Sequence, residues 1–163
     1  MANITASLVN ELRKRTGVGM MDCKKALVEC DGDMDKAIDY LREKGQKLAA
    51  KRADRDASEG AVLAAVNQDK TFAAVIMMNC ETDFVAKNDG FVDFAKTVLN
   101  AAIAAKAKDL QAVMSLTIDG VSVETMIIEQ VAKIGEKITL SHYLPIEAPA
   151  AYAYVHPGNR MAS

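Results

Sequence analysis

The sequence predicts an α+β protein with a three-helix bundle over residues 1–46 and an α+β core over residues 58–163, joined by a basic linker over residues 47–57. Three observations lead to this prediction. In the first part, apolar residues recur at helical spacing and glycines interrupt them. In the last part, short apolar and partly β-branched runs alternate with turn residues. Between the two, basic residues replace large apolar ones. A small antiparallel sheet with packed helices is therefore expected for the core.

The first 46 residues are expected to form three short helices. Thr5 can cap the first helix, and Thr16–Gly19 contains the glycines that end it. One face of that helix carries apolar residues four positions apart: Ile4, Leu8 and Leu12. A second helix is predicted from about Met20 to Cys30, and Asp33 caps a third that ends at Gly45. Because helices this short are unstable alone, they are expected to pack as a bundle.

After residue 46 the spacing of the apolar residues changes, and the remaining elements are predicted from it in chain order. Residues 47–57 contain four basic side chains, which predicts a solvated linker or an extended arm: Lys47, Lys51, Arg52 and Arg55. Ala61–Val66 and Thr71–Met78 flank the turn residues Asn67–Lys70, which is typical of a β-hairpin. Two helical stripes and two strands are predicted after the hairpin: Phe91–Ala102, Ile127–Ile134, Leu140–Ile146 and Tyr152–Val155.

Composition argues against several classes of function. The net charge of -2 leaves no large basic field for nucleic acid, and the absence of Trp argues against a base-stacking surface. Cys23, Cys30 and Cys80 are odd in number and form no Cys-x-x-Cys, so neither a disulfide framework nor a zinc site is expected. No signal peptide or membrane-spanning run is apparent, and a soluble cytoplasmic protein without metal or cofactor is expected.

Three motifs resemble sites of other chemistry but lack the residues or neighbours that those sites require. Asp31–Asp35 begins like a calcium loop, but Lys36 and Arg42 occupy the sixth and twelfth positions, where glycine and glutamate are required. Gly17-Val18-Gly19 follows no strand and is not a phosphate-binding loop. A thiol enzyme would need His142 or His156 beside Cys80, and nothing in the sequence indicates that proximity, so a buried, inert Cys80 is favoured.

Met20 and Met21 are adjacent on a predicted helix, and their side chains therefore point about 100° apart. Both are difficult to bury in so small a bundle. Methionine is adaptable enough to serve either as a protein contact or as irregular core filling. The residues alone leave these two interpretations open.

Residues 79–87, Asn-Cys-Glu-Thr-Asp-Phe-Val-Ala-Lys, follow the hairpin directly. Thr82 is a suitable N-cap for one helical turn that begins with Asp83 and Phe84. The residues alone favour a structural interpretation, in which Phe84 covers the core and Asp83 interacts with the helix dipole. The alternative is a protruding acid and aromatic ring side by side. His156–Arg160 is predicted to be a turn that closes the last strand.

Taken together, three motifs resemble the elongation factor Ts family. They are Leu12–Leu27, which includes Thr-Gly-Val-Gly-Met-Met-Asp-Cys-Lys-Lys-Ala-Leu, then residues 79–87, and finally His156–Arg160. Met77 departs from the family, which usually has an acidic residue there. In the family, the last arginine leads into an apolar strand and a second core subdomain, whereas only three residues follow Arg160 here. The chain is therefore expected to lack that second subdomain.

The resemblance implies that the N-terminal bundle is ubiquitin-associated-like and docks on the GTPase domain of elongation factor Tu. Four residues match the contact positions of that bundle: Leu12, Arg13, Met20 and Met21. Asp83 and Phe84 match a pair that intrudes near the magnesium and nucleotide site of the partner, with His156 supporting them. The resemblance thus implies a guanine-nucleotide exchange factor that acts on the GTPase and is not itself an enzyme.

A different class remains open beside this one. An adaptor of the ubiquitin-associated type would bind a protein partner without exchanging a nucleotide. It would use Met20 and Met21 but would give no role to Asp83 and Phe84.

Overall fold

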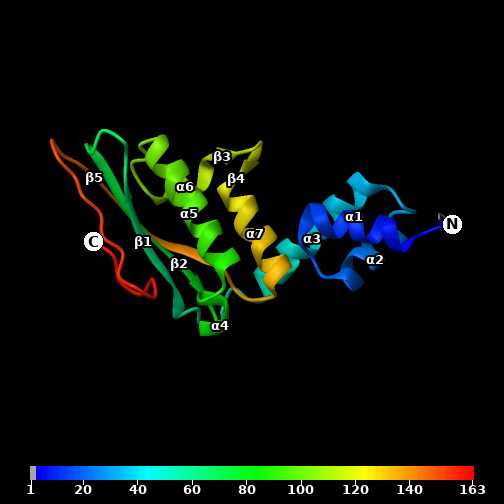
Figure 1. The fold of residues 1–163 in the computed structure, drawn as a ribbon. Helices are drawn as coiled ribbons and strands as arrows, with labels where there is room; N and C mark the ends of the chain where they lie inside the picture. The colour runs from blue at the N-terminus through cyan, green and yellow to red at the C-terminus, as the bar shows by residue number, and fades with distance from the viewer. Residues whose placement is uncertain (1–2) are drawn as a thin grey trace. The chain divides into compact units, whose positions relative to one another are not determined.

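A computed structural model describes residues 3–163 of the chain (Figure 1). The chain divides into two compact units. The first consists of Met1–Asp54 and Ile128–Glu136, and the second of Arg55–Ile127 and Lys137–Ser163. The mixture of helices with a small antiparallel sheet confirms the α+β class. No helix within residues 3–163 is long and apolar enough to cross a membrane.

The first unit contains the three predicted helices, α1 (Ala6–Thr16), α2 (Met20–Glu29) and α3 (Met34–Lys51). Their caps follow from local chemistry. The Thr5 hydroxyl accepts a hydrogen bond from the Leu8 N–H at 3.2 Å, and Gly17 adopts the left-handed conformation with φ 69° after α1. The Asp33 carboxylate caps α3. The buried core of the bundle consists of Val9, Leu12, Val18, Cys23, Ala26, Leu27, Ala37 and Leu41.

The third helix does not end at Gly45, as the sequence analysis expected, but continues to Lys51. The linker prediction is therefore wrong for residues 47–51, which are helical. Gly45 is buried, and a Cβ atom added there would lie 3.0 Å from the Ala132 Cβ and 3.3 Å from the Ile128 carbonyl oxygen. The glycine thus allows a neighbouring helix to approach closely and does not end its own.

That neighbouring segment is Ile128–Glu136, which includes the C-terminal part of α7 (Val123–Ile134). The Arg42 Nε donates a hydrogen bond to the Glu129 carboxylate at 2.8 Å, beside the Gly45 contact. This helix was predicted from the sequence, but all of it was expected to belong to the core. In the structure, residues 128–136 belong to the first unit, which therefore contains more than the three predicted helices.

The second unit is built on a three-stranded antiparallel sheet in the order β1-β2-β5. The predicted hairpin forms β1 (Glu59–Val66) and β2 (Phe72–Cys80), and the Asn67 side-chain oxygen accepts the N–H groups of Thr71 and Phe72 at its turn. Strand β5 (Thr139–Glu147) pairs with the other edge of β2.

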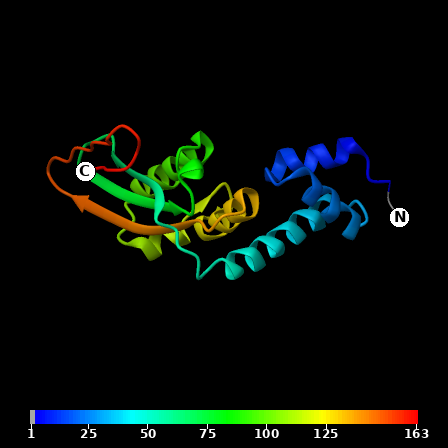
Figure 2. The ribbon, with the colours of Figure 1, turned by 90° about the horizontal axis from the view of Figure 1, so that it is seen from below.

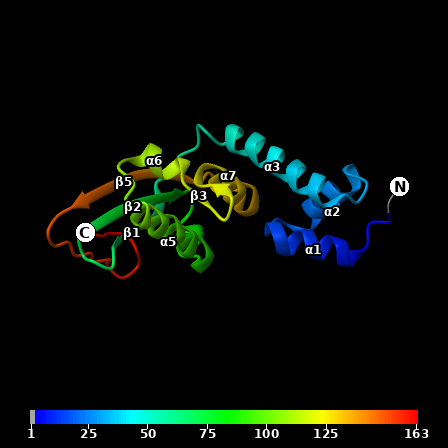
Figure 3. The same cartoon turned by 90° about the horizontal axis from the view of Figure 1, so that it is seen from above.

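Helix α5 (Asp89–Ala104) packs on β1 and β2, where Figures 1 and 3 show it over one face of the sheet. Its buried stripe includes every residue predicted for it: Phe91, Phe94, Ala95, Val98, Leu99 and Ala102. Three short elements were not predicted, because they are too short to show a hydrophobic period: α6 (Leu110–Ser115), β3 (Thr117–Ile118) and β4 (Val121–Ser122).

The predicted strand over Tyr152–Val155 does not form. Only Val155 makes an isolated bridge, with Ala162, while Tyr154 and Ser163 exchange backbone hydrogen bonds of 2.7 and 2.9 Å. The segment therefore pairs with the last residues of the chain and adds no strand to the sheet. This final segment, red in Figure 2, passes beside β1, where the Val62 N–H donates to the Asn159 carbonyl at 2.7 Å.

We expect Gly45→Val to lower the free energy of unfolding of the first unit by about 1–3 kcal/mol, because the added methyl groups would overpack the contact with Ile128 and Ala132. Gln46→Val is the control, because position 46 is exposed on the same helix and the change should cost only about 0.5 kcal/mol in helix propensity. Urea unfolding followed by circular dichroism measures both. A Gly45→Val variant as stable as the control would contradict close packing at this position.

Candidate functional site

A single helical turn, α4 (Asp83–Ala86), follows the end of β2 almost directly. The Thr82 hydroxyl accepts the Val85 N–H at 3.5 Å, as the N-cap prediction required. The Lys87 N–H donates to the Asp83 carbonyl at 3.1 Å and closes the turn. The turn places Asp83 and Phe84 at its start, on the surface of the second unit.

Phe84 is the most exposed large apolar side chain of the described residues, with 83% of its surface accessible. Phe91, at the start of the next helix, is only 1% exposed and fills the core. The interpretation in which Phe84 covers the core is therefore wrong. An aromatic ring this exposed on a short, capped turn is typical of a side chain that becomes buried on binding a partner.

Asp83 lies beside the ring and forms an ion pair with Lys87 at 2.6 Å. The hydrogen bond and charge of Lys87 lower the pKa of the Asp83 carboxyl, and the more distant charge of Arg160 acts in the same direction. Asp83 is thus ionised at neutral pH. The exposed surface of the turn therefore presents one negative charge next to one apolar ring.

The residues just before the turn hold it in place. Asn79 is buried, and its side-chain nitrogen donates to the Glu59 carbonyl at 3.3 Å while its side-chain oxygen accepts the Ser141 hydroxyl at 2.6 Å. The buried Cys80 thiol donates to the Thr82 carbonyl at 3.2 Å. Cys80 is buried, as predicted, and its thiol braces the turn. Asn79 was not among the predicted site residues, although an amide at the end of an apolar strand is a signal of a buried polar bridge.

His156 lies on the predicted turn after the last paired segment. Its Nδ1 and the Tyr154 hydroxyl are 2.9 Å apart, and both side chains are exposed. Arg160 of the same turn pairs with Glu59 at 2.7 Å, and Glu59 lies opposite Cys80 in the sheet. The ion pair anchors the turn at the end of the sheet where β2 leads into α4.

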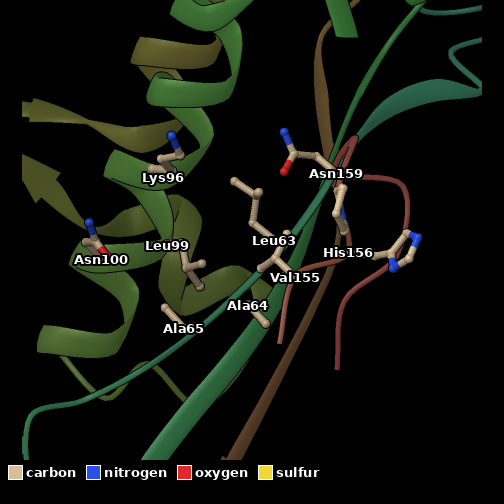
Figure 4. Close-up of a pocket in the computed structure, with 10 residues that line it drawn as sticks. Leu63, Ala64, Ala65, Lys96, Leu99, Asn100, Val155, His156 and Asn159 are labelled. Carbon is tan, nitrogen blue, oxygen red and sulfur yellow. The ribbon is translucent and has the colours of Figure 1, made fainter. Parts of the chain in front are cut away.

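The same turn borders a groove of about 460 Å³ between α5 and β1 (Figure 4). Its lining is mostly apolar, and the His156 ring is directed away from α5. The groove is lined by Leu63, Ala64, Ala65, Lys96, Leu99, Asn100, Val155, His156, Pro157 and Asn159. Within residues 3–163, no group of His, Cys, Asp and Glu side chains is arranged to hold a metal ion.

The first unit carries a second exposed apolar surface on α2. Met20 is 48% and Met21 75% exposed, so core filling is the wrong interpretation for Met21. Val28 is also exposed and was missed by the sequence analysis, although its position seven residues after Met21 places both on one helical face. Arg13 is exposed on α1.

Leu12 does not belong to this surface. Its side chain is fully buried among the core residues of the bundle. The expectation that Leu12 contacts a partner directly is therefore corrected, because a side chain without accessible surface can act only by supporting the residues above it.

Two family models match the sequence. The one described as "Elongation factor Ts, mitochondrial, N-terminal" matches residues 1–49, and the one described as "Elongation factor TS" matches residues 81–163. Both exposed surfaces, on α2 and on α4, fall inside the matched ranges.

Individual relatives named elongation factor Ts are similar over nearly the whole chain. The protein of Christiangramia forsetii is 53% identical, covering 99% of this chain and 58% of its own length. The protein of Amoebophilus asiaticus is 51% identical, covering 98% and 57%, and that of Rhodopirellula baltica is 47% identical, covering 99% and 49%. The chain thus spans between 49% and 58% of the length of these relatives.

Replacing Lys87 by Met should raise the pKa of Asp83 towards the ordinary carboxyl range, because Lys87 is the main cause of the lowered value. A lowered pKa contributes stability above the unfolded value of about 3.9, and that contribution is lost as the pH falls through the folded value. Carbon-detected NMR titration of the carboxyl groups measures the change.

Asp33 is the internal control for that titration. Its pKa is lowered chiefly by the backbone N–H of Lys36 at the start of α3, so it should stay low in the Lys87→Met variant. An Asp83 pKa that does not move would contradict the ion pair.

Proposed function

The chain belongs to the elongation factor Ts family, and from this premise we propose that it is a guanine-nucleotide exchange factor for elongation factor Tu. It would promote the release of GDP during the elongation cycle of protein synthesis, in the cytoplasm. It would bind its partner and catalyse no reaction of its own, since the GTPase holds the nucleotide and the magnesium ion. Neither a nucleic acid nor a membrane is a proposed partner.

The observation that supports this proposal most directly is the exposed ring of Phe84 beside the ionised Asp83. Exposing a phenylalanine forgoes about 1.5–3 kcal/mol of burial free energy, which binding to a partner would recover. The turn is capped and braced before binding, so little ordering would be needed at that moment. A short, stiff projection is suited to enter a site and displace groups there.

The mechanism follows from thermodynamic linkage. A GTPase of this kind holds GDP through backbone amides at a helix N-terminus and through a magnesium ion. In the proposed complex, Phe84 wedges between side chains beside the magnesium site and Asp83 perturbs the neighbouring polar contacts. A factor that favours the distorted, empty site must bind less tightly when GDP is present. GDP is released faster, and GTP then displaces the factor.

The bundle would supply affinity through the exposed surface of α2. Met20 and Met21 are the proposed anchors, and the exposed Val28 extends the same face. Arg13 would add a charged contact from α1. His156, linked to Tyr154 and anchored through Arg160 of the same turn, would support the site around Asp83.

The adaptor alternative also uses the exposed methionines, and nucleotide dependence distinguishes the two. An exchange factor must form its complex with nucleotide-free elongation factor Tu and lose it when GDP and magnesium are added in excess. An adaptor would bind with the same affinity in both conditions. The exposure of Phe84 favours exchange, because the adaptor gives that ring no role.

Asp83→Ala combined with Phe84→Ala should slow stimulated GDP release by at least about tenfold at saturating factor, because the wedge acts on the nucleotide site. Binding to nucleotide-free partner should change much less, because the bundle still anchors the complex. Release of a fluorescent GDP analogue measures the first effect and titration calorimetry the second. The unmodified chain must be shown to stimulate release in the same assay, and a normal release rate for the double variant would refute the wedge.

Stability measurements separate this effect from unfolding. Phe84→Ala should cost less than about 1 kcal/mol because the ring is exposed, whereas the matched core variant Phe91→Ala should cost about 3–5 kcal/mol. If Phe84→Ala were as destabilising as Phe91→Ala, Phe84 would be a core residue in solution.

Met20→Ala combined with Met21→Ala should weaken the complex with nucleotide-free elongation factor Tu by about 1–3 kcal/mol, the usual cost of truncating interface anchors. The bundle should stay folded, since both side chains are substantially exposed. Met161→Ala is the control, because Met161 is exposed in the second unit and has no proposed contact. Equal binding by both variants would contradict the proposal that Met20 and Met21 anchor the complex.

A further inference from the structure

Glu81 lies between the buried Cys80 and the capping Thr82, and the site geometry described above gives it no role. Its side chain is only 13% exposed, which is unusual for a carboxylate. Each carboxylate oxygen contacts a different part of the chain. One accepts the Lys137 backbone N–H at 2.6 Å, and the other pairs with the Arg55 guanidinium at 3.1 Å.

These contacts close a ring. The Lys137 ammonium group donates to the Arg55 carbonyl oxygen at 2.9 Å, so the three residues are joined pairwise although they lie far apart in the sequence. Arg55 and Lys137 are also the first residues of the two stretches that make up the second unit. Glu81 lies immediately before Thr82 and therefore ties the start of both stretches to the turn.

We propose that Glu81 is a positioning residue for the turn that carries Asp83 and Phe84. Its carboxylate holds Thr82 and the following turn against the segments at Arg55 and Lys137, so that the acid and the ring are presented in one arrangement. Charge-assisted hydrogen bonds of this kind are stronger and more directional than neutral ones. The inference rests on the proposed exchange function for its effect on GDP release, but not for its effect on the turn.

The physical reason lies in where the turn is otherwise held. The cap at Thr82 and the Cys80 thiol hold the start of the turn, whereas within α4 itself only Ala86 is buried and Asp83 pairs with Lys87. A wedge that is free to tilt would distribute its binding free energy over several arrangements. Moving a group that acts on the reacting site by about 1 Å can lower the rate roughly a hundredfold.

Two substitutions at position 81 give a graded test. Glu81→Gln keeps an oxygen that can accept the Lys137 N–H but loses the charge that attracts Arg55, whereas Glu81→Ala removes the carboxylate altogether. Glu147→Gln is the matched control, because Glu147 is an exposed carboxylate of the same unit, paired with Lys106 at 3.2 Å.

Amide hydrogen exchange of the chain alone provides the first measurement. In Glu81→Ala, the amides of Ala86 and Lys87, which are hydrogen-bonded within the turn, should exchange about tenfold faster, while buried α5 amides such as that of Leu99 keep the parent rate. Glu81→Gln should lie between Glu81→Ala and the parent, and Glu147→Gln should match the parent. Unchanged exchange at α4 in Glu81→Ala would overturn the proposal.

Stimulated GDP release provides the second measurement. Glu81→Ala should lower the maximal release rate about tenfold while its affinity for nucleotide-free elongation factor Tu changes less than about threefold, which is a loss in the rate and not in binding. A maximal rate equal to that of Glu147→Gln would overturn the positioning role. The positioning role would also be overturned if α5 lost protection from amide exchange and the affinity for elongation factor Tu fell as much as the release rate. Glu81 would then be a residue of general stability.

The two measurements keep this proposal separate from the proposed function. If the unmodified chain does not stimulate GDP release, the exchange function fails for this chain. Amide exchange then decides by itself whether Glu81 holds the turn.

Discussion

Strand β2 is hydrogen-bonded along both edges, and the place of the candidate site depends on this constraint. The strand pairs with β1 on one side and β5 on the other, and its side chains facing α5 are buried. A slip by one residue would exchange its two faces, so the register is strongly determined. Because β2 ends at Cys80, the position at which the chain leaves the sheet is determined as well. The turn with Asp83 and Phe84 begins there.

The motif of residues 79–87 therefore consists of two kinds of residue. The side chains of Asn79 and Glu81 bind four residues outside the motif: Arg55, Glu59, Lys137 and Ser141. The Cys80 thiol donates to the Thr82 carbonyl, and the Thr82 hydroxyl caps the turn. Asp83 and Phe84 project from this support. Each buried polar side chain is tolerated because it is hydrogen-bonded, and in the proposed positioning role the same bonds would stiffen the exposed pair. Residues 79–82 thus support the turn, and the next two residues of the same short stretch are exposed on it.

The two exposed surfaces lie in different units. The bundle has its own core and gains Ile128–Glu136, packed against Gly45 and Arg42. The second unit has the sheet and α5. In the proposed function, the surface on α2 would supply affinity and the surface on α4 would act on the partner.

The sequence by itself determined the features that depend on neighbouring residues. The caps at Thr5, Asp33 and Thr82, the hairpin turn at Asn67 and the buried stripe of α5 all follow from interactions within a few positions. The motifs were also sufficient to identify the family. The α+β class followed from the change of hydrophobic period.

Only the tertiary structure decided the features that depend on distant partners. Whether Gly45 ends its helix or packs against another depends on whether Ala132 lies beside it. Residues Tyr152–Val155 pair with the last residues of the chain and not with an edge of the sheet. The resemblance assigned contact positions to Leu12 and Met21 alike, but Leu12 is buried and Met21 is exposed. The contacts of Glu81 join residues far apart in sequence. Burial and ion pairing of this kind arise from the path of the whole chain, which no local pattern contains.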